Sequence, residues 1–154
     1  MWKLRFVIDS ADGWRDGLTV VAGEDAPLSL PLLIDRYGEA LMGKRNLLRY
    51  GDSFPLRIRI TDDGKEDFVE IESICPDGLP VTTNILDTDY GVIRDYTEFD
   101  TFSLIVCKSG NASVTCNGLT EEIGRGDILL IPASARGIRI EPHKKASLIE
   151  SYIR

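Results

Sequence analysis

The chain has 154 residues, of which 43% are hydrophobic and 28% charged, with a formal net charge of -7 and one histidine. This length and composition suit one globular domain, residues 1–154, and are not typical of a disordered chain. The acidic balance and the lack of a basic stripe argue against nucleic-acid binding, because such a surface repels phosphate backbones. No stretch approaches the roughly 20 apolar residues of a membrane span, and residues 1–8 are too soon charged for a signal peptide, so a cytoplasmic protein is expected.

The N-terminal part of the chain predicts two strands, or one strand with a bulge, followed by one helix. Apolar residues alternate within residues 4–8 and again within 18–21, with turn residues between the two segments. A helix is expected to begin after Ser29, which is a candidate N-cap, and to end at Gly43. Between these two positions apolar residues recur at helical spacing, and we interpret this apolar stripe as core packing.

From residue 54 onward the hydrophobic period shifts to two. Residues 54–61 and 68–74 alternate on either side of an Asp-Asp-Gly-Lys turn, which predicts a hairpin. Further short strands are predicted at residues 81–86, 91–96, 102–108, 112–116, 128–131, 137–140 and 147–153. A single open sheet of this size would leave exposed edges, so the pattern predicts a mainly β jelly roll, sandwich or barrel.

The cysteines and the histidine do not form a recognisable site. Cys75, Cys107 and Cys116 are odd in number and lack CxxC spacing, which argues against both a disulfide framework and a zinc knuckle. We expect reduced thiols, with Cys107 and Cys116 as small core residues. His143 falls in the polar stretch 142–145, which is interpreted as a turn between the last two strands, so it is expected to be an exposed surface residue.

Two segments of the C-terminal half resemble cupin motifs. Residues 126–132, a Gly-Asp turn followed by a buried strand and a proline, are similar to the start of the second cupin motif, and residues 102–118 to the end of the first. Cupins normally bind a metal through histidines in these motifs, and none is present here. The corresponding positions hold Thr97, Glu98 and Phe99 in the first motif and Ser134, Arg136 and Gly137 in the second.

A broader resemblance covers most of the chain in two blocks. Residues 1–74, with the segments 37–45 and 54–60, and residues 75–154, with the cupin segments above, are similar to the N-terminal and C-terminal blocks of class I mannose-6-phosphate isomerases of the short bacterial type. The resemblance implies a cupin-like jelly roll, or double-stranded β-helix, with one α-helix near the N-terminus. It also implies zinc in the family, but the central region that supplies much of that metal site has no counterpart in this sequence.

Three residues of the hairpin are the candidate binding residues. Counted without a gap from Arg59, Glu70 and Glu72 stand where the resemblance places a glutamine and a histidine ligand; aligned on residues 65–67 instead, Ile71 and Ser73 stand there. Arg59 stands where the family has a lysine near its site. Two carboxylates two residues apart share one face of a strand and could bind a hard cation, and a guanidinium could hold a sugar phosphate. Alternating charged residues are also typical of the solvent side of a strand, and the sequence leaves both interpretations open.

These observations lead to three hypotheses about function. The first is a degenerate, metal-free cupin that binds a small sugar or sugar phosphate, or acts as an interaction module, without a catalytic role and without a cofactor. The alternative is an enzyme of the isomerase type, interconverting mannose 6-phosphate and fructose 6-phosphate with a site rebuilt from Arg59, Glu70 and Glu72. The third is a structural protein that associates through barrel edges as a homo-oligomer. The family resemblance alone leaves catalysis open.

Overall fold

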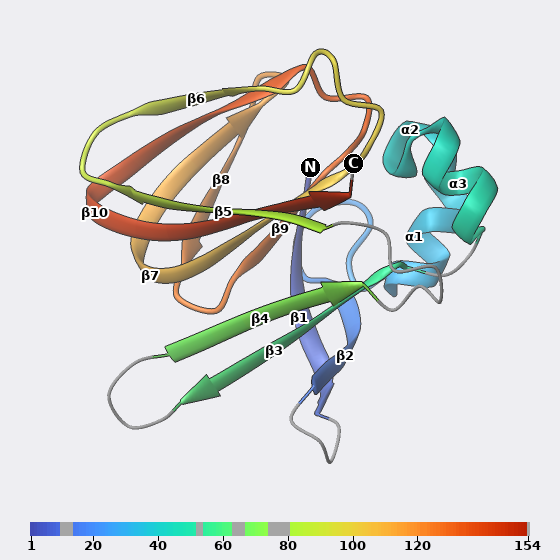
Figure 1. The fold of residues 1–154 in the computed structure, drawn as a ribbon, viewed down its shortest axis with the longest axis horizontal. Coiled ribbons are helices and arrows are strands. Elements are labelled where there is room, and N and C mark those ends of the chain that lie inside the picture. The colour runs from blue at the N-terminus through green and yellow to red at the C-terminus, as the bar shows by residue number, and fades with distance from the viewer. Residues whose placement is uncertain (10–13, 52–53, 63–66, 74–80, 154) are drawn as a thin grey trace.

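The protein is built around one large antiparallel sheet. The computed structural model describes residues 1–9, 14–51, 54–62, 67–73 and 81–153, with the backbone alone described for strand residues 6–9, 14–17, 59–62 and 67–73. The strand order is β4-β3-β2-β1-β9-β7-β10-β5, with β6 also paired to β10 and β8 to β7. The sheet curls, so that β5 to β10 form a barrel while the β3–β4 hairpin extends below it (Figure 1).

The first two strands and the hairpin confirm the alternating pattern of the N-terminal half. Their bounds are β1 Trp2–Asp9, β2 Trp14–Val20, β3 Leu56–Asp62 and β4 Asp67–Ser73. β2 joins the hairpin to the rest of the sheet through two residue pairs with β3, Trp14 with Arg59 and Arg15 with Ile58. β1 pairs in turn with β9, from Trp2 opposite Leu130 to Leu4 opposite Ile128, so the two blocks of the sequence share one sheet.

The expectation of a single helix was wrong. The described part of the chain forms three short helices, α1 Leu30–Tyr37, α2 Glu39–Met42 and α3 Lys44–Tyr50. Gly38, at φ 52° and ψ -123°, breaks the first helix, and after Gly43 the chain becomes helical again as far as Tyr50. Ser29 occupies the N-cap position of α1 in extended conformation, but its side chain makes no capping hydrogen bond.

The C-terminal strands are fewer and longer than predicted. Their bounds are β5 Val81–Thr88, β6 Val92–Asp95, β7 Ser103–Cys116, β8 Leu119–Gly124, β9 Ile128–Ile131 and β10 Gly137–Ile153. The predicted break near Gly110 and the predicted polar turn at residues 142–145 both lie inside strands. These two irregularities face each other, since Ala146 pairs with Gly110, and the register shifts between Pro142 and Ala146. β7 and β10 thus bend together rather than ending, as strands do at bulges.

β8 was not predicted, although the sequence carries a signal for it. Asn117 and Gly118 both have positive φ, 51° and 80°, and together connect β7 to β8. Asn-Gly is the favoured pair for a two-residue hairpin turn, because both central positions of a type I′ turn need positive φ. Apolar alternation does not indicate this hairpin, because the Glu-rich strand that follows the turn has few apolar residues.

Two hydrophobic cores lie on opposite faces of the central strands. β9 shows the division, because Leu129 and Ile131 point into the barrel while Ile128 and Leu130 pack on its outer side. Burial on both faces explains why this strand is a continuous apolar run. The outer core also contains residues of α1, α2 and β3, so residues of both sequence blocks contribute to it.

Aliphatic and small side chains occupy much of the barrel interior. Those buried in the interior cluster are Tyr96, Ile105, Cys107, Ala112, Val114, Cys116, Ile123, Leu129, Ile131, Ala135, Ile138, Ile140, Ala146 and Leu148. Cys107 and Cys116 are buried free thiols, as predicted, while Cys75 lies outside the described residues. The buried hydrophobic lining of the interior is therefore made mainly of aliphatic and small residues.

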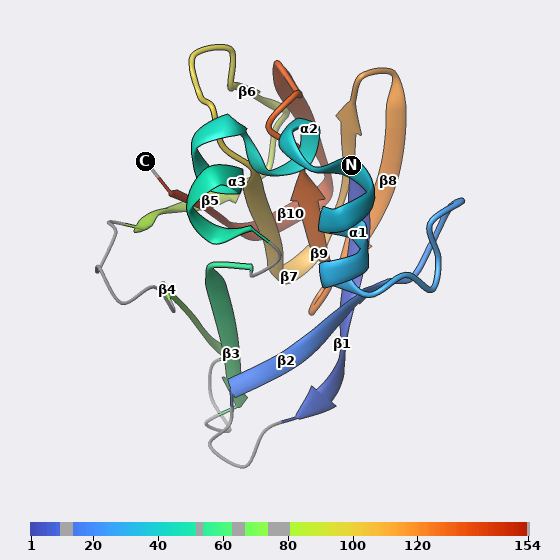
Figure 2. The same ribbon diagram turned by 90° about the vertical axis from the view of Figure 1, so that its right-hand side faces the viewer.

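The three helices gather at one end of the barrel (Figure 2). The backbone N–H groups of Ala133 and Ser134, which follow β9, donate to the carbonyl oxygens of Leu41 and Ala40 in α2 at 2.9 and 3.0 Å. These bonds fix α2 against the loop between β9 and β10. Within the described ranges, no helix has the length and apolar content that crossing a membrane requires.

Candidate functional site

The three residues singled out in the sequence lie on the β3–β4 hairpin. The backbone register pairs Arg59 with Glu70, and Arg57 with Glu72. The side chains of Arg59, Glu70 and Glu72 lie outside the described residues. Pairing of Arg59 with Glu70 across the ladder is the arrangement in which opposite charges stabilise adjacent strands. A binding role for these three residues remains a prediction.

The two segments that correspond to the cupin metal-binding motifs do meet in space. The backbone N–H of Tyr96 donates to the carbonyl oxygen of Arg136 at 2.8 Å, and the Thr97 hydroxyl lies 3.4 Å from the same oxygen. His143 lies elsewhere, exposed on β10, with its Nε2 2.6 Å from Glu122 Oε2. As expected from its sequence position, it is a surface residue, although it belongs to a strand rather than to a turn.

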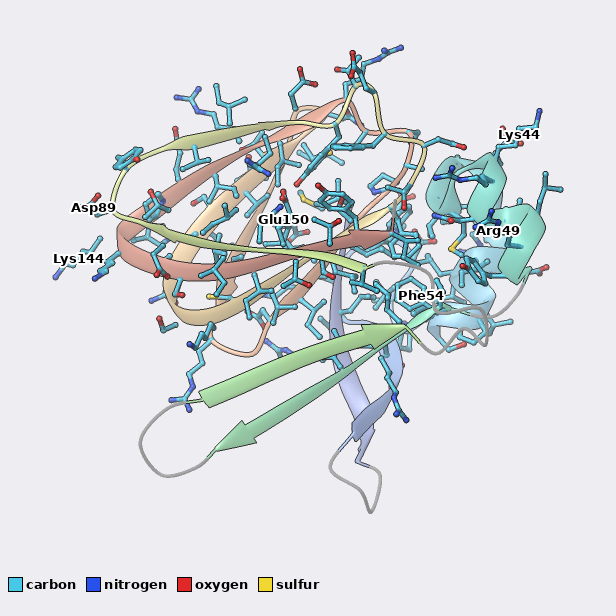
Figure 3. The ribbon with its side chains drawn as sticks, viewed as in Figure 1. Lys44, Arg49, Phe54, Asp89, Lys144 and Glu150 are labelled. Atoms are coloured by element: carbon cyan, nitrogen blue, oxygen red, sulfur yellow. The ribbon has the colours of Figure 1, made fainter. Side chains whose placement is uncertain are left out.

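An ion pair between a fully buried carboxylate and a half-buried guanidinium lies close to these segments. Glu150 of β10 has no exposed surface, and its label falls within the barrel in Figure 3. Arg94 of β6 donates to both carboxylate oxygens, through Nη2 to Oε1 at 2.7 Å and through Nε to Oε2 at 3.0 Å. The Tyr96 hydroxyl donates to Oε2 at 2.5 Å and Asn84 Nδ2 to Oε1 at 2.9 Å. We call these four residues the Glu150 cluster.

The hydrogen bonds of the Glu150 cluster decide its charge state. Burial would raise the pKa of Glu150, but the hydrogen bonds from Arg94, Tyr96 and Asn84 outweigh it and hold the pKa below its ordinary value of 4.5. Burial and the adjacent carboxylate raise the pKa of Tyr96, so its hydroxyl remains a donor. Near neutral pH the cluster is therefore an ionised carboxylate neutralised by one guanidinium.

The sequence did contain a signal for this cluster. Leu148, Glu150 and Tyr152 alternate along one face of β10, and the first and last of these are buried. A glutamate at the central position of such a face needs a buried partner, because an isolated buried carboxylate is very costly. Sequence pattern alone gives no indication that the partner is Arg94, 56 residues away.

The described residues do not fit the zinc that the family resemblance implies. Zinc sites need imidazole, thiolate or carboxylate donors that are free to coordinate. Both oxygens of Glu150 already accept hydrogen bonds, and Cys107 is a buried thiol whose pKa is raised to about 11 by burial and by Asp127. In the part of the chain that the structure describes, no three His, Cys, Asp or Glu side chains come together in a metal-binding group.

A cavity of about 610 Å³ lies at the helical end of the barrel. Its lining residues are Arg45, Glu98, Phe99, Asp100, Thr101 and Ile153. Figure 3 locates α3, the helix that carries Arg45, by the labels of Lys44 and Arg49 at this end. The volume falls in the range of small-molecule sites, about 300–1,000 Å³.

Phe99 connects this cavity to the Glu150 cluster. Its ring centroid lies 5.0 Å from that of Tyr152 and 6.2 Å from that of Tyr96, in tilted arrangements that suit aromatic pairs. The Phe99 side chain is 38% exposed, whereas Tyr96 is 4% exposed. Phe99 thus forms part of the cavity wall and packs on the rings of Tyr96 and Tyr152. Tyr96 is in turn held by its hydrogen bond to Glu150.

The acidic and hydroxyl groups of the cavity are positioned by α3. The Asp100 carboxylate accepts hydrogen bonds from the backbone N–H groups of Lys44 and Arg45 at 3.1 and 3.3 Å. Asn46 Nδ2 donates to the Thr101 hydroxyl oxygen at 2.8 Å. Among the described residues, the Arg45 guanidinium and the Glu98 carboxylate have no hydrogen-bond or ion-pair partner. Both groups are available to a ligand.

Comparison with known proteins supports the fold. No protein-family model matches the chain, and neither does any curated protein. The structure is similar to that of a "putative mannosephosphate isomerase" from Archaeoglobus fulgidus, with a TM-score of 0.64 and 9% sequence identity. The match covers 99% of this chain and 88% of the Archaeoglobus chain.

Two further solved structures match parts of the chain. A cupin-2 domain containing protein from Shewanella frigidimarina matches 48% of this chain and 71% of its own, at 9% identity and a TM-score of 0.41. A cupin superfamily protein from Desulfitobacterium hafniense matches 64% of this chain and 76% of its own, at 12% identity and the same TM-score. At such identities a likeness shows the fold alone. The chain has a mainly β, cupin-like jelly-roll fold.

Proposed function

We propose that this protein is a non-catalytic cupin-fold module that binds a small neutral sugar in the cavity beside α3. The observation that carries the proposal is the composition of the cavity wall, which combines an exposed phenyl ring with a free guanidinium and a free carboxylate. A sugar ring has an apolar C–H face that packs on an aromatic ring and hydroxyl groups that bond to planar polar side chains. Phe99 offers the first kind of contact, and Arg45 and Glu98 offer the second.

The charges around the cavity favour a neutral sugar over a sugar phosphate. Arg45 contributes one positive charge, whereas Glu98 and Asp100 contribute two negative charges, and the whole chain carries -7. The backbone N–H groups at the start of α3, which could otherwise bind a phosphate, already donate to Asp100. An added phosphate would be repelled by this field.

Binding measured by calorimetry on the intact chain tests the proposal. We expect one member of a panel of neutral hexoses and pentoses to bind. Phe99→Ala should raise the Kd for that sugar about tenfold, which is a loss of about 1.4 kcal/mol in binding free energy. Arg45→Met should raise the Kd by about tenfold or more, the effect of losing one hydrogen bond to a charged group, which is about 1.5–3 kcal/mol. Tyr90→Ala is the matched control, since this exposed aromatic residue does not line the cavity and should leave Kd unchanged. The proposal is wrong if no sugar binds, or if both cavity variants bind as the wild type does.

The isomerase alternative is supported by the likeness to the Archaeoglobus protein. Aldose-ketose conversion needs a base and a group that polarises the carbonyl, and a metal that polarises the carbonyl contributes several kcal/mol to lowering the barrier. Incubation of the pure protein with mannose 6-phosphate and zinc, with fructose 6-phosphate as the measured product, separates the two functions. If the wild-type protein forms fructose 6-phosphate and Glu70→Gln or Glu72→Gln does not, the isomerase alternative replaces the binding proposal. In that alternative Arg59 would hold the phosphate.

A further inference from the structure

β5 is an edge strand of the sheet. Among the described residues, its eight residues pair with β10 alone, from Val81 opposite Ile153 to Thr88 opposite Ala146. Figure 1 shows β5 along the outer side of β10 at the rim of the barrel. An edge of this kind presents unpaired backbone N–H and C=O groups along its free side, which can pair with another strand.

The sequence of β5 lacks the features that usually protect an edge. Proteins block edge pairing with charged residues, especially lysine, with proline, or with bulges. The edge strand β8 carries Glu121 and Glu122, and β4 carries three carboxylates in seven residues. β5, with the sequence VTTNILDT, has neither lysine nor proline, and its one charged residue is Asp87. The Ser147 hydroxyl on β10 donates to Asp87 Oδ1 at 2.5 Å, so this carboxylate is held toward its own sheet.

The same edge carries exposed apolar side chains. Ile85 on β5 is 69% exposed, Tyr90 in the turn that follows is 71% exposed and Ile93 on β6 is 76% exposed. An edge strand with a free backbone side and exposed apolar residues beside it is prone to pair with another strand. The absence of protective charges therefore points to a partner strand.

We propose that β5 pairs antiparallel with β5 of a second copy of this chain, about a two-fold axis at Ile85. In this register Ile85 opposes its own copy, and Thr83 of one chain opposes Asp87 of the other, on the same face of the continuous sheet. An axis at Asp87 would place this carboxylate opposite itself, and an axis at Thr88 would place it opposite Asp89. Like charges directly opposite each other destabilise a strand pair, whereas a hydroxyl can donate to the carboxylate. Charge complementarity therefore favours the Ile85 register and a closed, isologous dimer.

The molar mass in solution, measured by sedimentation over a range of concentrations, is the first test. We expect a monomer–dimer equilibrium and at least a tenfold weaker dimer, or about 1.4 kcal/mol, for Ile85→Lys, which puts two ammonium groups face to face. Leu48→Lys on α3, where the leucine is 79% exposed, is the control and should leave the dimer unchanged. A wild-type monomer at all concentrations, or an Ile85→Lys dimer of unchanged strength, overturns the proposal.

The position of the axis has a test of its own. Thr83→Asp would set a carboxylate opposite Asp87 of the partner twice per dimer and should weaken the dimer, whereas Thr83→Lys should preserve or strengthen it.

Disulfide cross-linking is a second test of the axis position. In a Cys75→Ser background, the two introduced thiols of an Ile85→Cys dimer should form an intermolecular disulfide, with oxidised glutathione accepting the two electrons and two protons that they release. The reason is that directly opposed Cα atoms lie about 4.5–5.5 Å apart, within disulfide range. Leu119→Cys on the edge strand β8 should stay uncross-linked. Equal dimerisation of both Thr83 variants, or no covalent dimer of Ile85→Cys, would show that the axis is elsewhere.

Discussion

Replacing Arg94 with methionine is expected to lower the free energy of unfolding by about 3 kcal/mol, because it leaves the Glu150 carboxylate buried without its counter-ion. Arg94 supplies two of the four hydrogen bonds to a side chain with no exposed surface. Methionine keeps much of the length and apolar contact of the arginine stem, so the loss isolates the charge and its hydrogen bonds. Urea or guanidinium denaturation monitored by circular dichroism measures the change.

Arg139 provides a matched control for this substitution. It lies on the same barrel and forms an ion pair with Glu141 at 2.9 Å, but its side chain is 65% exposed. Arg139→Met should cost less than about 1 kcal/mol, as exposed ion pairs do. The double variant Arg94→Met with Glu150→Gln should recover much of the loss, since the amide removes the unpaired charge. Equal losses in the free energy of unfolding for Arg94→Met and Arg139→Met would show that burial of the Glu150 carboxylate does not make its ion pair more costly to break.

The same cluster predicts a loss of stability in acid. The pKa of Glu150 in the folded protein lies below its ordinary value of 4.5, because hydrogen bonding outweighs burial. A carboxyl group whose pKa is depressed on folding contributes stability that is fully present above the unfolded value and is lost as pH falls through the folded value. The free energy of unfolding should therefore fall below about pH 4.5, and this component should be absent in Glu150→Gln. An unchanged pH profile in that variant would assign the acid sensitivity to other carboxylates.

Gly43→Ala is expected to lower the free energy of unfolding by on the order of 3 kcal/mol and to weaken ligand binding in the cavity. Gly43 has φ 85° and ψ 149°, a conformation that is essentially limited to glycine. A Cβ atom at this position would lie 2.4 Å from the Asp100 carbonyl oxygen and 3.0 Å from Asp100 Oδ1. Since Asp100 both caps α3 and lines the cavity, the substitution forces apart the two segments that form the site.

Gly23→Ala separates backbone strain from the steric clash. Gly23 has the same φ of 85°, but a Cβ atom there would meet no heavy atom within 4 Å. The control should therefore show only the strain of a positive φ, about 1–2 kcal/mol, and should leave sugar binding unchanged. Denaturation and calorimetry of the two variants measure both effects. Similar losses in the free energy of unfolding for Gly43→Ala and Gly23→Ala would show that the clash with Asp100 is not what destabilises Gly43→Ala.

Local pattern was sufficient for the elements whose partners are near in sequence. The hairpin of β3 and β4 and the two N-terminal strands follow from alternation and turn residues, and the continuous apolar run of β9 indicated a buried strand, which the structure shows to be covered on both faces. The helical region was predicted in its first part only. Apolar spacing ran through Gly38, and a single-chain pattern does not show that the backbone turns there.

Long-range pairing decided what the pattern did not. The sequence around Gly110 and at residues 142–145 predicts turns. In the structure both segments lie inside long paired strands, where Ala146 pairs with Gly110 and the register shifts between Pro142 and Ala146. The same applies to the site. The candidate residues Arg59, Glu70 and Glu72 came from a resemblance and from strand alternation, and their side chains lie outside the described residues, so their role stays a prediction.

The amino-acid sequence by itself determined that this chain is mainly β and that its one histidine is exposed, because alternation, turn residues and composition are local properties. The choice of a cupin-like jelly roll among the possible β folds came from the family resemblance, and the structure confirms it. Only the tertiary structure decided that Glu150 is neutralised by Arg94 and that Phe99, Arg45 and Glu98 surround one cavity. These residues come from separate strands, a loop and a helix, and no periodic pattern links them. They meet because a curled sheet brings β6 against β10 and places α3 over the barrel end.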